Sequence, residues 1–88
     1  MPVTKKLHIG FINIGTERVC DVYKGTRDEC LQELNIWILN YAYVQGLTIL
    51  QLPPLDDWTL EASGWWSYHP DGHKHILIGL YAEDIKFP

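Results

Sequence analysis

Three histidines close together in the sequence are the residues best suited to chemistry in this chain. His69, His73 and His75 flank a Pro-Asp-Gly turn, where imidazoles on adjacent strands have the spacing to bind zinc, with Asp71 as a fourth ligand. No group that would orient these imidazoles is evident around the exposed turn. We therefore expect a solvated strand end without a metal, and a small metal-binding protein or hydrolase at these histidines is the alternative.

Other groups with catalytic chemistry are few. Asp56 and Asp57 are adjacent carboxylates, and a histidine of the turn has the chemistry of a general base. No nucleophile, phosphate-binding loop or oxyanion donor accompanies them, so we expect a protein that is not an enzyme. Cys20 and Cys30 fall at packing positions and lack metal-ligand spacing, which indicates reduced thiols and no cofactor, with one disulfide between them as the alternative.

The stretch from Leu60 to Ala82 predicts a β-hairpin around this turn. Its Pro-Asp-Gly sequence suits a tight turn, and apolar segments lie on both sides. The expected register places Ser67 opposite His75, so that alternate residues define two faces. The apolar face contains Leu60, Ala62, Trp66, Tyr68, Ile76, Ile78 and Leu80. The other face is aromatic and polar, and contains Trp65, Ser67, His69, His73, His75 and Tyr81.

The aromatic and polar face of the hairpin is the predicted partner-binding surface. Trp and Tyr are frequent anchors at protein interfaces, and His makes an adaptable polar surround. The predicted contact residues are Trp65, His69, His73, His75 and Tyr81, with Asp56 and Asp57 supplying charge toward a basic partner. Three alternatives remain for Trp65, which are packing over a neighbouring strand, packing of the helix on this face instead, and formation of a symmetric homodimer.

The charge of the chain argues against direct binding of nucleic acid. A net charge of −4 and a pI of about 5.4 leave no basic patch for phosphates, although the aromatic rings alone would suit base stacking. An acidic protein is instead suited to compete for the basic surface of a nucleic-acid-binding complex. The chain lacks an apolar signal-peptide core and a membrane-length apolar stretch, so we expect a cytoplasmic protein without membrane contact.

The remaining sequence predicts one small α+β domain over residues 1–88. Strands are expected at residues 6–14, 18–24 and 47–52, before the two strands of the hairpin. One helix, residues 27–45, should begin at a Thr26–Glu29 capping box and end at Gly46. This ββαβββ order favours a single helix packed on one face of a mainly antiparallel four- to five-stranded sheet. The other face would be left to solvent or to a partner.

In its size, its element order and its closing aromatic hairpin, GWWSYHPDGHKH, the chain resembles small accessory proteins of phages and mobile elements. Some anti-CRISPR inhibitors belong to this group. The resemblance implies a viral protein that acts without catalysis, by occupying a surface of a host defence complex, often its nucleic-acid-binding surface. We therefore expect a non-enzymatic binding protein that inhibits or modulates a larger protein or nucleoprotein complex.

Overall fold

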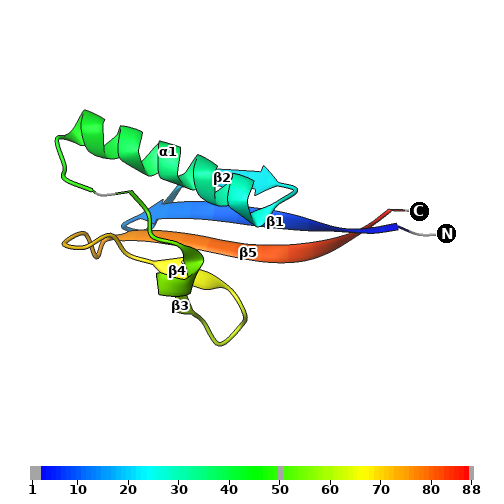
Figure 1. The fold of residues 1–88 in the computed structure, drawn as a ribbon. Coiled ribbons are helices and arrows are strands. Elements are labelled where there is room, and N and C mark those ends of the chain that lie inside the picture. Colours follow the sequence, from blue (N-terminus) through cyan, green and yellow to red (C-terminus); the bar gives the residue numbers. More distant parts are fainter. Residues whose placement is uncertain (1–2, 50, 88) are drawn as a thin grey trace.

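The computed structural model describes residues 3–49 and 51–87 and shows one helix packed against a five-stranded antiparallel sheet (Figure 1). The elements are β1 (Val3–Ile14), β2 (Glu17–Lys24), α1 (Arg27–Gln45), the 3-10 turn η1 (Leu55–Asp57), β3 (Thr59–Leu60), β4 (Trp66–Tyr68) and β5 (Ile76–Phe87). The strand order in the sheet is β2-β1-β5-β4-β3. The predicted α+β fold class is therefore confirmed.

Helix α1 has the start and the end that its sequence predicts. The Thr26 hydroxyl oxygen accepts the Glu29 N–H at 3.2 Å, and the hydroxyl donates to the Glu29 carboxylate at 3.0 Å. Gly46 ends the helix at φ 69°, a left-handed conformation that glycine adopts without strain. The residues buried against the sheet are Cys30, Leu34, Ile38 and Ala42. No helix in the described ranges is both long and apolar enough to cross a membrane.

Two segments, α1 and the connection that follows it, together form the layer that covers one face of the sheet. Helix α1 packs on β1 and β2 and reaches β5 only at its margin, so it is too narrow for five strands. The connection that leads from α1 to β3 runs down across the rest of this face (Figure 1). From this connection, Leu52, Leu55 and Trp58 join the buried cluster of α1 and the central strands.

The predicted strand at residues 47–52 is wrong. The described residues of this segment are not in a strand, and the third strand is instead the short β3. Leu52 is buried, and its N–H donates to the side-chain oxygen of Asn35 at 2.8 Å. The apolar residues of this segment pack on the part of the sheet that α1 does not cover. The segment does not continue as a strand, because Pro53 and Pro54 cannot donate ladder hydrogen bonds.

The predicted hairpin forms from β4 and β5, but its expected register is wrong. Ser67 pairs with Gly79 rather than with His75. The connection is wider than a tight turn, because His73 N–H bonds to Pro70 O at 2.9 Å and a second turn follows directly. The displacement is an even number of residues, so the paired side chains of β4 and β5 stay on their predicted faces, whereas His69, His73 and His75 lie outside the two strands.

The two longest strands, β1 and β5, extend beyond the rest of the sheet. Residues 3–7 pair with residues 83–87, whereas β2 begins to pair at His8 and β4 pairs only as far as Leu80. The result is a two-stranded ribbon with both ends of the chain at its tip (Figure 1).

Candidate functional site

Three aromatic side chains converge on the sheet face opposite α1, which we call the open face. The ring centroid of Phe11 lies 5.7 Å from that of Trp65 and 6.3 Å from that of Tyr81. These rings come from β1, from the residue just before β4, and from β5. With Ser63, Gly64, Ala82 and Glu83 they line a shallow hollow of about 450 Å³, which we call the aromatic hollow.

Phe11 lies over β5 because the residue paired with it is a glycine. A side chain at Gly79 would overlap the Phe11 ring. On the other side of Gly79, Ser67 is buried, and its hydroxyl donates to the Glu61 carboxylate at 2.6 Å. A strand glycine with a ring over it is typical of close side-chain approach across a sheet. Phe11 is thereby buried on a face that no helix covers.

A β-bulge brings a positive charge to the same ring. The pairing of β1 with β2 shifts between Ile12 and Asn13, and this shift aims Arg18 onto the open face. The Arg18 guanidinium lies 4.1 Å from the Phe11 ring centroid and donates to Asn13 at 2.6 Å and to Asp21 at 2.9 Å. These contacts hold the cation over the face of the ring, a favourable cation–π arrangement.

Trp65 is held by a tight turn formed by residues 61–65. The Glu61 N–H donates to the Trp65 carbonyl at 2.8 Å, and the Gly64 N–H donates to the Glu61 carbonyl at 2.9 Å. Gly64 has φ 90°, which a residue with a side chain rarely adopts. Trp65 and Tyr81 are both partly exposed. Rings that are held in place and still accessible lose little entropy on binding, which suits interface anchors.

The three predicted histidines lie at the other end of the hairpin. Tyr81 is six positions along the chain from His75, a distance of about 20 Å in an extended strand. The His69 Nδ1–H donates to Ile76 O at 2.7 Å, and the His73 Nε2–H donates to Thr48 O at 3.3 Å. Within residues 3–49 and 51–87, no three His, Cys, Asp or Glu side chains are grouped to hold a metal ion. The structure thus brings Trp65 and Tyr81 together and places the histidines elsewhere.

The predicted acidic residues lie apart from both the aromatic hollow and the histidines. Asp56 and Asp57 are exposed in η1, just before the buried Trp58. Burial, followed by the charges of Asp71 and Asp57, raises the pKa of Tyr68. The Tyr68 ring stacks on Trp58 at 5.5 Å and packs against the core under α1. The charge of Asp57 therefore acts close to a ring on the helix-covered side.

Sequence reasoning missed Phe11, the residue at the centre of the aromatic hollow, and Arg18 above it. A signal was present in Gly79, which interrupts a run of large apolar residues in β5. A glycine inside a strand pattern marks close approach by a neighbouring side chain. The strand that supplies this side chain is distant in the sequence, so Gly79 shows where a side chain packs closely but not which residue it belongs to.

These features define an α+β protein with an aromatic hollow on its open sheet face. Comparisons of the chain with protein-family models, curated proteins and solved structures find no match. The arrangement of the chain's own residues is therefore the main basis for proposing its function.

Proposed function

We propose that this chain is a non-catalytic binding protein that inhibits or modulates a larger protein or nucleoprotein complex. Binding would centre on the aromatic hollow, with Trp65 and Tyr81 as anchors. The histidines of the turn and Asp56 and Asp57 would make outer contacts if the partner extends along the hairpin. The observation that carries this proposal is the convergence of three rings on an uncovered sheet face.

The build of the hollow supports binding over simple surface packing. The absence of a side chain at Gly79 makes room for the Phe11 ring, the turn at residues 61–65 holds Trp65, and the Arg18 guanidinium lies over the Phe11 ring. A preorganised aromatic site loses less side-chain entropy when a partner docks. Aromatic and Arg side chains are also the commonest residues at the energetic centres of protein interfaces.

The charge of the chain favours a partner with a basic surface. The net charge is −4, and Glu83 lines the hollow directly. Opposite charges at the rim speed association and select between partners. The basic surfaces of nucleic-acid-binding complexes meet this requirement, in agreement with the resemblance to phage-encoded inhibitors of host defence. A viral origin and a cytoplasmic location are part of the same proposal.

The test is binding to a partner isolated with the tagged chain from lysate of the source cell or its host. The partner would be purified and its affinity measured by calorimetry. Trp65→Ala and Tyr81→Ala should each weaken binding by about 30-fold or more, the effect of losing an interface anchor. Denaturant unfolding of each variant would confirm that it still folds.

The matched control is Tyr43→Ala. Tyr43 is 88% exposed at the end of α1 and does not line the aromatic hollow, so its removal should leave partner affinity unchanged. Full affinity in both Trp65→Ala and Tyr81→Ala would refute the proposed site. Hydrolytic or metal-dependent activity of the purified chain that is lost with His73→Ala would replace the binding function by a catalytic one.

A further inference from the structure

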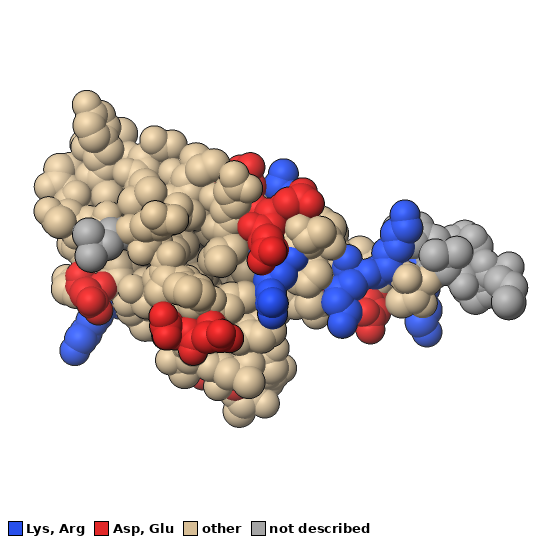
Figure 2. Space-filling view, viewed as in Figure 1, with Lys and Arg blue, Asp and Glu red and all other residues tan. Residues whose placement is uncertain are grey.

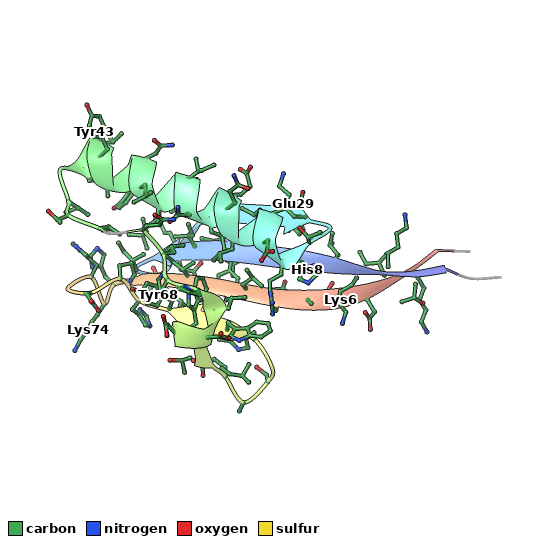
Figure 3. The ribbon with its side chains drawn as sticks, viewed as in Figure 1. Lys6, His8, Glu29, Tyr43, Tyr68 and Lys74 are labelled. Atoms are coloured by element: carbon green, nitrogen blue, oxygen red, sulfur yellow. The ribbon has the colours of Figure 1, made fainter. Side chains whose placement is uncertain are left out.

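The exposed apolar side chains of the molecule are gathered on two elements. Among the described residues, six large apolar side chains are exposed, and all but Leu60 lie on β2 or α1: Val19, Tyr23, Ile36, Tyr43 and Val44. The sequence from Leu34 to Leu55 contains no Asp, Glu, Lys or Arg. Figure 2 shows the result as a broad surface without charged residues over the second half of α1. Tyr43 projects from this end of α1, away from the sheet (Figure 3).

A groove of about 520 Å³ runs between α1 and the outer edge of β2. Residues of β2 from Cys20 to Val22 line one side. The other side is a single stripe of α1, formed by Glu33, Ile36, Trp37, Asn40, Tyr41 and Val44. Trp37 and Tyr41 stack along this stripe, with ring centroids 5.4 Å apart and planes 11° apart. The groove therefore has an aromatic wall beside a β-strand edge.

Strand β2 lies at the end of the sheet order, where it pairs with β1 alone among the described strands. An edge strand presents N–H and C=O groups to a further strand, and proteins usually protect such edges with charges or bulges. Here the bulge and Arg18 lie toward one end. In the middle of the strand the single charge, Asp21, is bound to Arg18 on the open face. The helix-side residues at the edge are the apolar Cys20 and Val22.

We propose that the occupant of this groove is a second copy of the same chain. The two β2 strands would pair antiparallel about a two-fold axis perpendicular to the sheet, joining two five-stranded sheets into one. Because α1 lies over β1 and β2, the two helices would be two strand spacings apart, about 10 Å. This is the distance at which helices pack together. The same step that pairs the strands therefore brings the two helix stripes into contact.

The charges near the middle of β2 suit antiparallel pairing about Cys20. In this register the Asp21 carboxylate of each copy lies close to the partner's Arg18 on the open face, so the ion pairs of the two chains join into one cluster of alternating charge. On the helix-covered side, the strand residues nearest the axis are the apolar Cys20 and Val22, and the stripe of α1 beside them is apolar and aromatic apart from Glu33 and Asn40.

The dimer goes beyond the proposed function because it uses a different surface. With both helices on the same side of the joined sheet, both aromatic hollows open on the opposite side. Two linked hollows would bind a partner with repeated sites more tightly than one hollow does, through a raised effective concentration. The two proposals fail separately, because loss of the dimer leaves each hollow intact.

The test is the mass of the purified chain in solution, measured by sedimentation equilibrium over micromolar concentrations. The mass should rise from 10.2 kDa toward twice this value as concentration increases. Val44→Glu and Ile36→Glu place a carboxylate in the interface twice, by symmetry, and each should raise the dimer dissociation constant by about 30-fold or more. Both side chains are exposed in the single chain, so neither change should unfold it.

The matched control is Leu60→Glu, an exposed leucine on β3 at the opposite edge of the sheet. This variant should dimerise as the unchanged chain does. A mass of 10.2 kDa at every concentration would overturn the proposal. A dimer that survives Val44→Glu and Ile36→Glu, or that is lost in Leu60→Glu or Trp65→Ala, would place the interface elsewhere and overturn it as well.

Hydrogen exchange gives a second readout that needs no variant. Pairing of two β2 strands would protect the outward-facing amides of Glu17–Lys24 as the concentration rises. The amides of β3 should exchange at the same rate at all concentrations. Protection that does not depend on concentration at β2 would contradict strand pairing between copies.

Discussion

The two faces of the sheet bury apolar side chains in different ways. On the helix-covered face, Ile12, Ile78 and Leu80 are completely inaccessible to solvent, because α1 and the connection after it form a second layer. On the open face, Phe11 is almost as well buried by neighbours within the sheet, by Trp65 and by Arg18. A separate layer excludes solvent from the side chains beneath it and is itself part of the core. The rings that cover Phe11 exclude solvent from it but remain partly exposed themselves. The first arrangement serves stability, and the second leaves a surface for binding.

The largest expected effect is a difference in the free energy of unfolding between variants of two tryptophans, one on each face of the sheet. Trp58 is buried on the helix-covered side, and its indole N–H donates to Pro53 O at 2.9 Å. Trp58→Ala should therefore lower the free energy of unfolding by about 3–5 kcal/mol. Trp65→Ala should cost about 1 kcal/mol, because Trp65 is partly exposed and packs mainly on one ring. Urea unfolding of the two variants measures both values, and equal losses would remove the distinction between the faces.

A second comparison uses two glycines that face opposite sides of the sheet. Gly79→Ala would displace the Phe11 ring, and we expect it to cost about 1–3 kcal/mol. Gly10→Ala would instead press on Leu34 Cδ1, 2.7 Å from the new methyl group, on the helix-covered side. In NMR spectra, Gly79→Ala should shift the Trp65 indole resonance and Gly10→Ala the Leu34 methyl resonances. Shifts of Trp65 in both variants would mean that the faces are coupled through the sheet.

The helix-covered face should also weaken at high pH. Burial, followed by the charge of Cys20, raises the pKa of the Cys30 thiol from 9.0 to about 11, although Lys24 acts in the opposite direction. Between these values the unfolded chain loses the thiol proton while the folded chain keeps it, so stability falls as pH rises. The urea midpoint should decrease from pH 9 to pH 11. Cys30→Ala should show a smaller decrease over the same range, and an equal one would assign the effect to other groups.

The smallest expected effect concerns Arg18 on the open face. Arg18→Ala removes the cation from above Phe11 and the contact with Asp21, and should cost less than about 1 kcal/mol, since both partners of the ion pair are exposed. Lys74→Ala, in the hairpin turn, is the control for loss of one positive charge. Urea midpoints of the two variants at low and high salt give the comparison. A loss as large as that of Trp58→Ala would mean that the open face depends on this cation for its stability.

Local patterns in the sequence predicted the helix, its two ends and the side of each paired residue in β4 and β5. They did so because Thr26, Glu29 and Gly46 act on the nearest backbone, and because strand alternation is set by the chain itself. The hairpin register was wrong since alternation fixes the face and not the partner, and the width of the turn decides the partner.

Contacts between distant segments could not be predicted in the same way. Residues 47–52 have the composition of a strand, and only the width of α1 relative to the sheet explains why Ile49 and Leu52 pack on the core instead. Phe11 was not placed in the site because its neighbours Gly79, Trp65 and Tyr81 are far away in the sequence. The exposed apolar residues of α1, Ile36, Tyr43 and Val44, were likewise not predicted, since apolar spacing does not show which residues of a helix remain uncovered.

The central pairing of β1 with β5 has a consequence for synthesis of the chain. These neighbouring strands are the first and the last of the fold to be made, and their outermost described residues, Val3 and Phe87, pair with each other. During translation, β1, β2 and α1 emerge early, but the inner edge of β1 has no partner until β5 leaves the ribosome. Such non-local pairing slows folding and leaves an unpaired edge exposed in the meantime. The middle of the sheet is therefore the last part of it to be completed.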